Sequence, residues 1–336
     1  MNGDRVGDEV RAALSVADDA GASPSERTEM LMEIAMGLQQ RPKNPEQIAA
    51  AVFLYDRALA LCPEDQRLLD ARIMARKGTA LLVLPEGGTL ALQQAREAFE
   101  AAIPHFTDFG RPEELAETEM NLGLAIQNLA GQHKARITDA ISAYQRALRT
   151  FDKLRFPKEF AIVQNNVATA FLSMPFTDSR AKMREALAVQ AFEEGLKVVN
   201  LIDHPTEYAM LQNNLGNALQ YASSSRTLEN NLRALDAYDE ALKVRSRETM
   251  PLEFANTIAN KANCVWNLPD DPEHPERGNR VNLLLAQQYY QECRTIFSRS
   301  GEAEKSRFVA EACDQIGREL LAVAPTNGTG AHAQTG

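Results

Sequence analysis

The chain has 336 residues, of which 44% are hydrophobic and 24% are charged, and its formal net charge is -10. Nucleic-acid binding requires a dense basic surface that displaces counterions from phosphates, and the sequence contains no such basic run. No stretch approaches the ~18 consecutive apolar residues of a membrane span. We therefore expect neither a nucleic-acid partner nor a membrane association.

Residues 1–24 precede any repeated pattern. Acidic residues are scattered through this segment, which lacks the basic start and unbroken apolar core of a secretory signal. We expect a flexible segment, with at most one short helix around residues 9–18. The expected location of the protein is the cytoplasm.

A helical pattern recurs six times between residues 25 and 300. Each copy has a small residue, an aromatic residue four positions later, and another small residue three positions after that. The copies are Ala51/Tyr55/Ala58, Ala95/Phe99/Ala102, Ala140/Tyr144/Ala147, Ala188/Phe192/Gly195, Ala234/Tyr238/Ala241 and Ala286/Tyr290/Cys293. This spacing places all three residues on one helical face. Two small side chains there admit a neighbouring helix, and the aromatic side chain fills the contact.

A further small residue precedes each copy and indicates a first helix. We assign it to Gly37, Gly78, Gly123, Ala168, Gly216 and Ala262. In the last four copies a proline lies eleven residues earlier and is followed by a glutamate two positions on, and these prolines are Pro112, Pro157, Pro205 and Pro251. Proline suits the first turn of a helix, and a carboxylate is favoured at its positive end. Glycine inside a helix costs about 1 kcal/mol, so glycines at one phase indicate a close helix crossing.

The first and second helices predicted for each copy together resemble the helix pair of the tetratricopeptide repeat (TPR). The resemblance is carried by Asn214-Leu215-Gly216-Asn217-Ala218 with Ala234, Tyr238 and Ala241, and by Asn121-Leu122-Gly123-Leu124-Ala125 with Ala140, Tyr144 and Ala147. It implies an all-α, right-handed α-solenoid of about six helix pairs, with first helices lining a concave face. Successive copies are 44 to 52 residues apart, against about 34 in the family, so we expect longer helices and loops.

Residues 301–324 indicate one more helix after the last pair. A terminal helix of this kind caps the exposed apolar end of a repeat array. Ala310, Ala312, Ile316 and Leu320 are the side chains expected to face the last pair. Residues 325–336 are rich in glycine, threonine and alanine, and we expect them to be a disordered tail.

Asparagine recurs at one phase of the first helices. Asn121, Asn166, Asn214 and Asn260 each lie two residues before the small residue, and Asn256, Asn260, Asn263 and Asn267 form one stripe at helical spacing. An amide both donates and accepts hydrogen bonds, so a column of amides could pair with the backbone of an extended peptide. The TPR consensus often has asparagine at these positions for structural contacts, so both readings stay open.

The predicted partner-binding surface is therefore the concave face. Its residues are Asn121, Asn166, Thr169, Asn214, Asn217, Gln220, Tyr221, Asn256, Asn260, Asn263, Trp266 and Asn267. Trp266 is the only tryptophan, and it is either an interface anchor or a packing residue against the following helix. Arg76 and Lys261 do not form the paired basic pattern of TPR domains that clamp a carboxylate, so no clamp is predicted.

No motif predicts catalysis. The sequence has no His-Glu-x-x-His, no Gly-x-Ser-x-Gly, no phosphate-binding glycine loop and no dinucleotide fingerprint. The four cysteines are far apart, and the acidic loop at residues 268–280 contains a single histidine. We expect no catalytic residue, no metal and no cofactor.

The resulting prediction is a cytoplasmic scaffold or adaptor that binds a segment of a partner protein in the concave groove. Three alternatives stay open: a self-associating structural platform, a non-catalytic subunit of an enzyme system, and a receptor for a peptide signal.

Overall fold

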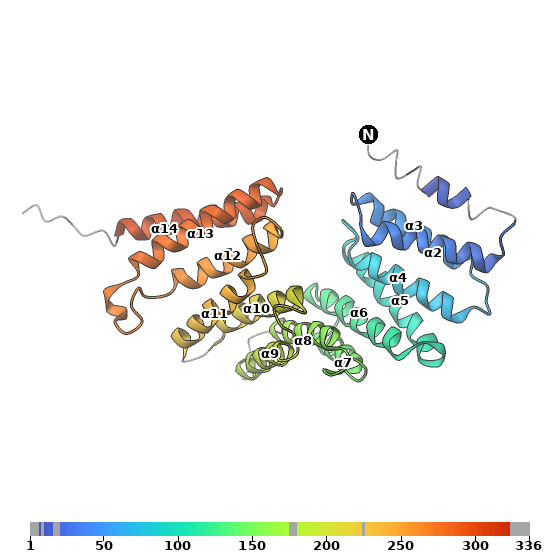
Figure 1. Cartoon of the computed structure of the whole chain (residues 1–336), viewed down its shortest axis with the longest axis horizontal. Coiled ribbons are helices and arrows are strands. Elements are labelled where there is room, and N and C mark those ends of the chain that lie inside the picture. Colours follow the sequence, from blue (N-terminus) through green and yellow to red (C-terminus); the bar gives the residue numbers. More distant parts are fainter. Residues whose placement is uncertain (1–6, 8–9, 16–20, 175–179, 224–225, 323–336) are drawn as a thin grey trace, which may run out of the picture. The chain divides into compact units, whose positions relative to one another are not determined.

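The computed structural model describes residues 7, 10–15, 21–174, 180–223 and 226–322 (Figure 1). Helices are the regular structure of these ranges, and the expected all-α solenoid is confirmed. The elements are α2 (Pro24–Gln40), α3 (Glu46–Leu61), α4 (Arg67–Leu82), α5 (Gly88–Phe109), α6 (Pro112–Gly131), α7 (Ile137–Ala147), α8 (Pro157–Leu172), α9 (Ala181–Leu196), α10 (Pro205–Gln220), α11 (Thr227–Leu242), α12 (Pro251–Trp266), η1 (Pro275–Arg277), α13 (Arg280–Arg299) and α14 (Ala303–Ala322).

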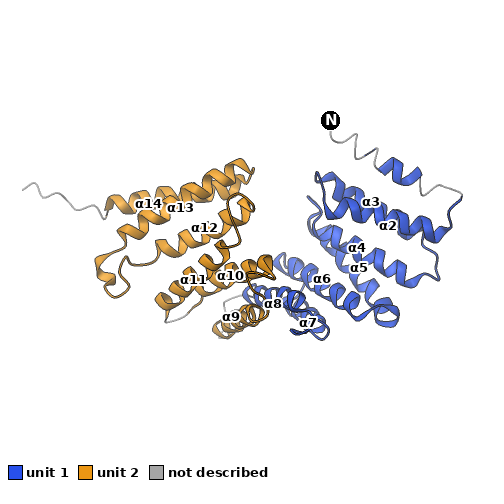
Figure 2. Ribbon diagram, viewed as in Figure 1, with its two compact units in different colours: residues 1–176 blue, residues 177–336 orange. Residues whose placement is uncertain are grey.

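The chain divides into two compact units, residues 1–176 and 177–336 (Figure 2). In the N-terminal unit each helix from α2 to α8 packs on the next, and the first helices α2, α4, α6 and α8 also meet in succession. In the C-terminal unit each helix from α9 to α14 packs on the next, and α10 meets α12. We number the repeats 1 to 6 by their helices in chain order, from α2/α3 to α12/α13, with α14 after them, and α8 and α9 of repeat 4 belong to different units.

The recurring aromatic residue is the centre of each second helix. Tyr55, Phe99, Tyr144, Phe192 and Tyr238 are 0% exposed, and Tyr290 is 1% exposed. The small residues on either side are also buried. These six faces therefore form the core that their spacing predicts, and Cys293 serves there as a small packing residue.

Glycine on the first helix lies directly under the aromatic ring of its own repeat. A Cβ added at Gly123 would lie 2.4 Å from a ring atom of Tyr144, and at Gly78 and Gly216 the corresponding distance is 2.6 Å. Such a distance is shorter than any van der Waals contact between carbon atoms. The ring of the second helix thus packs on bare backbone, which explains glycine at the helix crossing.

The assignment of Gly37 as the crossing residue of repeat 1 is wrong. Gly37 is exposed, and a Cβ there would meet no atom within 4 Å. Ala35, two residues earlier, is 0% exposed and belongs to the same buried cluster as Tyr55. The error arises because two small residues lie close together in α2, and only packing against α3 distinguishes them.

With Ala35 as the crossing residue, the opening signature also appears in repeat 1. Pro24 lies eleven residues before Ala35, and Glu26 follows by two. The Glu26 carboxylate accepts a hydrogen bond from the Ser23 backbone at 2.8 Å, while the Ser23 hydroxyl accepts one from the Glu26 backbone at 3.3 Å. This reciprocal capping box satisfies two backbone donors at the start of α2. Positions are counted below from the crossing residues Ala35, Gly78, Gly123, Ala168, Gly216 and Ala262.

Side chains in the connecting loops fix the entry of the following helix. The Asp152 carboxylate accepts hydrogen bonds from the backbone of Leu154 and Arg155 at 2.9 and 3.0 Å. In the longest loop, Asp270 accepts from the backbone of Val281 and Asn282 at 2.9 and 2.8 Å, at the start of α13. Acidic side chains of these loops thus act as turn and helix caps.

The capping helix is present as predicted. Ala312 and Ile316 are buried against the last pair, together with Val309, which is 1% exposed. Ala310 and Leu320 are half-buried. At the other end, residues 10–15 are helical, and Ala13 packs into the cluster around Leu31. The disorder expected for residues 325–336 lies outside the described residues.

Two properties of the described ranges concern metals and membranes. No group of three His, Cys, Asp or Glu side chains within them is placed to hold a metal ion. None of the helices described is both long enough and apolar enough to cross a membrane.

Candidate functional site

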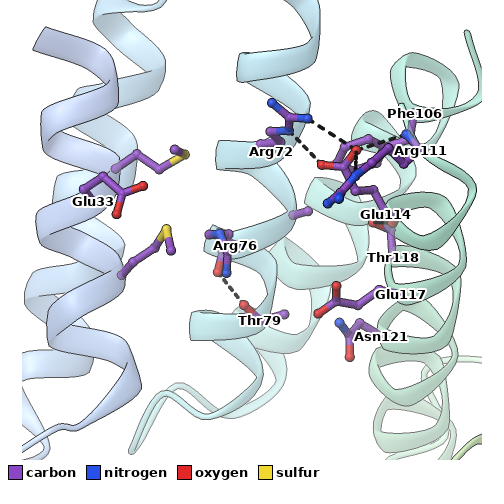
Figure 3. Close-up of a pocket in the computed structure, with 13 residues that line it drawn as sticks. Glu33, Arg72, Arg76, Thr79, Phe106, Arg111, Glu114, Glu117, Thr118 and Asn121 are labelled. Atoms are coloured by element: carbon purple, nitrogen blue, oxygen red, sulfur yellow. Dashed lines mark hydrogen bonds and ion pairs between the residues drawn. The ribbon is translucent and has the colours of Figure 1, made fainter. Parts of the chain in front are cut away.

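A pocket of about 250 Å³ opens on the first helices of the N-terminal unit (Figure 3). Helices α2, α4 and α6 supply most of its wall, with one aromatic side chain from α5. Its lining residues are Met32, Glu33, Met36, Arg72, Ala75, Arg76, Thr79, Phe106, Arg111, Glu114, Glu117, Thr118 and Asn121.

One phase of the repeat supplies a polar residue to this pocket from each of three helices. Position −2 holds Glu33 in repeat 1, Arg76 in repeat 2 and Asn121 in repeat 3. Figure 3 shows these three side chains projecting from successive first helices. The sequence predicts Asn121 here, but it misses Glu33 because the wrong crossing residue was assigned in α2.

Glu114 is held between two arginines at the upper edge of the pocket. Its carboxylate lies 2.7 Å from Arg72 Nε and 3.4 Å from Arg111 Nε, and its side chain is 14% exposed. Burial alone would raise the pKa of Glu114. Hydrogen bonds from Arg72 and the Arg111 backbone, with the charges of both arginines, outweigh burial and lower the pKa. This ion pair links α4 to α6 and leaves Glu114 committed to a structural role.

Arg76 differs from these two arginines. No carboxylate in the described part of the chain lies within ion-pair distance of its side chain, and its backbone carbonyl accepts from the Thr79 hydroxyl at 2.7 Å. Glu33 and Glu117 are exposed at the same pocket. The lower part of the pocket therefore presents charged groups that are available to a ligand.

A hydrogen-bonded relay connects the core tyrosines to this face. Tyr144 donates to Gln127 Oε1 at 2.8 Å, and Gln127 Nε2 donates to the Thr169 hydroxyl at 3.2 Å. Tyr55 donates to Gln39 at 2.7 Å, and Gln39 donates to Thr79 at 2.9 Å. In each relay the glutamine is at position +4 of its repeat, and the threonine is at position +1 of the next.

The relay alternates along the chain. Repeats 1, 3 and 5 combine a core tyrosine with glutamine at position +4, whereas repeats 2 and 4 combine a core phenylalanine with Leu82 and Leu172 at that position. Where the hydroxyl is lacking, the amide that would accept from it is lacking too. Repeat 6 departs from this alternation because its core tyrosine, Tyr290, is combined with Trp266 at position +4, so the alternation extends over repeats 1 to 5.

Replacement of Tyr144 by phenylalanine is expected to lower the free energy of unfolding by about 1 kcal/mol, because the half-buried amide of Gln127 loses its donor. Urea denaturation followed by far-UV circular dichroism measures this effect. The double variant Tyr144→Phe/Gln127→Leu reproduces the pairing of repeats 2 and 4. It should recover part of the loss, and a double variant no more stable than Tyr144→Phe would contradict the relay.

In the C-terminal unit, the predicted amides bond mainly to one another and to core tyrosines. Asn213 donates to Asn214 Oδ1 at 3.0 Å, and Asn260 donates to Asn213 Oδ1 at 3.3 Å. The Tyr238 hydroxyl lies 2.8 Å from the side-chain oxygens of both Asn217 and Gln220. These contacts favour a structural role for Asn217 and Gln220.

The rest of the predicted surface lies on α12 and at the C-terminal ends of α10 and α12. Asn263 donates to the Tyr221 hydroxyl at 2.7 Å, and Asn267 donates to the Asn263 carbonyl at 2.7 Å. Trp266 donates through Nε1 to Glu319 of α14 at 2.8 Å, and its ring meets the edge of Tyr290. The tryptophan is half-buried against α14, and Asn256 is half-buried on α12.

The structure thus divides the predicted surface. Asn121 lines the pocket, and Asn166 accepts a hydrogen bond from Asn165 at 3.3 Å. The buried partners Asn165 and Asn213 were not predicted, although both belong to Asn-Asn pairs in the sequence. Arg72 and Glu117 of the pocket were not predicted either, and Arg76, which the sequence did not indicate as part of a carboxylate clamp, lines the pocket as well. The use of the predicted residues by a partner stays a prediction.

The sequence matches no protein-family model, and a search of curated proteins found no match. Among solved structures, the chain is similar to a STAND signal-transduction ATPase with a TPR sensor from Pyrococcus horikoshii. The identity is 13% and the TM-score is 0.55, and the match covers 94% of this chain and 44% of that one. This chain therefore spans less than half the length of the archaeal protein.

Two further structures resemble the chain more loosely. BtubC from P. vanneervenii matches over 98% of both chains with 14% identity and a TM-score of 0.39. The TPR2AB domain of yeast Sti1, in a complex with pHSP90, matches over 87% of this chain and 99% of that one, with 14% identity and a TM-score of 0.31. Because both TM-scores are below 0.5, the fold assignment rests on the first comparison and on the repeat geometry. Successive helix pairs, glycine under the core aromatic residues and similarity to a protein that contains a TPR sensor show that this chain has a TPR-like helical-repeat fold.

Proposed function

We propose that this chain is a non-catalytic interaction module that holds a segment of a partner protein against α2, α4 and α6. The observation that carries the proposal is the pocket into which three successive first helices direct Glu33, Arg76 and Asn121. A site built from one phase of consecutive repeats suits an extended ligand that runs across the helices. The proposed setting is the cytoplasm.

The chemistry of the lining suggests what the segment presents. Met32 and Met36 form an apolar wall on α2, and methionine adapts to side chains of different shape. Arg76 and Asn121 offer donors to a backbone carbonyl or a carboxylate. An apolar side chain next to an oxygen-bearing group therefore fits the pocket, and the exposed acids Glu33 and Glu117 favour a basic residue beside them.

Not all of the other predicted surface residues are proposed as contacts of the partner. The internal bonds of Asn217, Gln220, Asn263 and Trp266 support a structural role. The TPR region of the archaeal protein is described as a sensor. Recognition of a peptide or protein that acts as a signal is also consistent with this pocket.

Site-specific cross-linking tests the proposal. The full-length chain with a benzophenone amino acid in place of Met36 is irradiated in lysate of the source organism. We expect one discrete covalent adduct whose yield falls at least about fivefold with Arg76→Ala or Asn121→Ala, equivalent to about 1 kcal/mol of binding. The matched control carries the benzophenone in place of Phe53, which is 46% exposed on α3.

An adduct of equal yield from both positions would argue for unspecific capture. An adduct at Met36 that is unchanged by both substitutions would show that the pocket does not bind the partner. Circular dichroism of each variant confirms beforehand that the helices are intact.

A further inference from the structure

The first helix of repeat 1 has an exposed apolar residue at a position where the residue of every later repeat is buried. Position −5 is occupied by Ile73, Thr118, Val163, Leu211 and Thr257 in repeats 2 to 6, and these side chains are at most 3% exposed. The helix before each of these first helices packs against it. Met30 occupies the same position in α2 and is 42% exposed. Repeat 1 therefore presents a surface that a helix covers elsewhere in the array.

This surface is a groove with an apolar floor and an acidic rim. Its volume is about 820 Å³, and its lining residues are Gly21, Ala22, Glu26, Glu29, Met30, Glu33 and Ile34. Ala22, Met30 and Ile34 form the floor. The helical residues 10–15 pack through Ala13 on the Leu31 cluster and leave Met30 exposed.

The rim carries three carboxylates on one face of α2. Glu26, Glu29 and Glu33 follow one another at spacings of three and four residues. Like charges at this spacing repel and destabilise a helix. Glu26 bonds to Ser23, and no basic side chain within the described ranges lies at ion-pair distance from Glu29 or Glu33. A cation brought to this rim would relieve the repulsion.

The interior of the same array shows how such a cation is supplied. Glu26 and Glu114 occupy the same position, −9, and both accept a backbone hydrogen bond in a capping box. At Glu114 the preceding first helix, α4, adds Arg72 at 2.7 Å. Glu26 has the same carboxylate in the same local setting, but no arginine or lysine of the described residues lies at ion-pair distance from it.

We propose that this end groove is a docking site for a basic amphipathic helix of a partner protein. The partner helix packs on α2 with apolar side chains against Met30 and Ile34, and it places an arginine or lysine at Glu26 as α4 places Arg72 at Glu114. A helix with apolar anchors three and four residues apart fits a groove of this kind. The site is separate from the pocket between α2, α4 and α6, apart from Glu33, which lines both.

Helix α4 itself provides a defined probe. Residues 67–82 contain Arg67, Arg72, Arg76 and Lys77 against the single acid Asp70, with Leu68, Leu69 and Ile73 as apolar residues. The probe is a synthetic, side-chain-stapled copy of residues 67–82, labelled for fluorescence anisotropy. Stapling is needed because an isolated helix of this length is marginal in water, and circular dichroism verifies its helicity before use.

Titration of the full-length chain into this peptide is expected to give saturable binding with a Kd on the order of 10–100 μM. Glu26→Gln removes the charge but retains a side chain that can complete the capping box, and it should weaken binding about tenfold. The peptide with Arg72→Glu should weaken binding to a similar degree. The matched control Glu97→Gln, an exposed glutamate on α5, and the pocket variant Arg76→Ala should bind the peptide as the natural chain does.

Three results would overturn the proposal. The first is no binding of the helical peptide up to about 1 mM, weaker than any specific complex of interest. The second is binding that neither Glu26→Gln nor Met30→Arg reduces. The third is a concentration-dependent dimer in sedimentation velocity that Met30→Arg dissociates, because the occupant of the groove would then be a second copy of the chain. If Met30→Arg does not fold, Glu26→Gln and the Arg72→Glu peptide decide the outcome.

Discussion

Replacement of Gly123 by alanine is expected to lower the free energy of unfolding by about 1–3 kcal/mol, the usual cost of overpacking a core. The added Cβ would lie 2.4 Å from the ring of Tyr144, which is fully buried and has no space to move into. The same change at Gly37 meets no atom within 4 Å and is expected to stabilise the chain by about 0.5–1 kcal/mol, because alanine favours the helix. Urea denaturation followed by far-UV circular dichroism compares the two midpoints.

The opposite signs of the two effects make the comparison decisive. Ala35 and Ala262 occupy the crossing position in repeats 1 and 6, so a methyl group is tolerated where the helix pair is spaced for it. At Gly123 an added methyl group would force α6 and α7 apart, and the decrease in the free energy of unfolding measures how rigidly these two helices are packed. A neutral Gly123→Ala would contradict close packing of Tyr144 on α6. A destabilising Gly37→Ala would restore Gly37 as the crossing residue of α2.

Stability is expected to fall steeply between about pH 9 and pH 11, because six buried groups in the core resist deprotonation. Burial raises the pKa of Tyr55, Tyr144, Tyr238 and Tyr290 well above the ordinary value of a phenol. Burial likewise raises the pKa of Cys264 and Cys293 to about 12. Each of these groups is 0–1% exposed in the structure.

The direction of the effect follows from proton counting. Since the folded pKa values are raised, the unfolded chain releases these protons at a pH at which the folded chain still holds them. The stabilising contribution is complete below the unfolded pKa values, about 8.5 for cysteine and 10 for tyrosine, and is lost as the pH rises toward the folded values. Each group lowers the free energy of unfolding by at most about 1.4 kcal/mol per pH unit in that interval.

Urea denaturation at a series of pH values measures this slope, with phenolate absorbance and circular dichroism recorded on the same samples. We expect the buried tyrosines to ionise together with the loss of helix, in one transition. Tyr144→Phe removes one buried ionisable group. The free energy of unfolding should therefore fall less steeply with pH above pH 10, by the contribution of one proton. Gradual ionisation of all tyrosines near pH 10 with the helices intact would contradict the burial of the four core rings.

Local spacing explains why the sequence predicts most of the fold. A small-aromatic-small face at offsets of four and seven lies within two helical turns, so its burial follows from helix geometry alone. Tyr238 and Phe99 are buried for this reason, and α14 is recognisable because Ala312 and Ile316 continue the same periodicity. The proline and glutamate that open α6, α8, α10 and α12 form an equally local sequence signal, and the structure shows that the same two residue types open α2.

The candidate site depended on relations across the fold that no local pattern contains. Arg72 and Glu114 are 42 residues apart, and only the packing of α4 on α6 brings them together. The sequence does not distinguish Gln127 from a surface glutamine, because its hydrogen-bond partners Tyr144 and Thr169 belong to the next two helices, α7 and α8. The asparagine phase was visible in the sequence, but the hydrogen bonds of Asn217 and Asn263 to tyrosines distinguish structural amides from those at the pocket.

The sequence by itself therefore determined the helical repeat, its buried faces and the capping helix, because each depends on residues within one or two turns of each other. The tertiary structure decided which small residue of α2 lies at the crossing, because Ala35 and Gly37 differ only in their distance from α3. It also decided which polar residues are available for binding, because availability is set by neighbours from other repeats. Met30 is exposed while Ile73 is buried for the same reason: burial of a side chain depends on the helix that covers it.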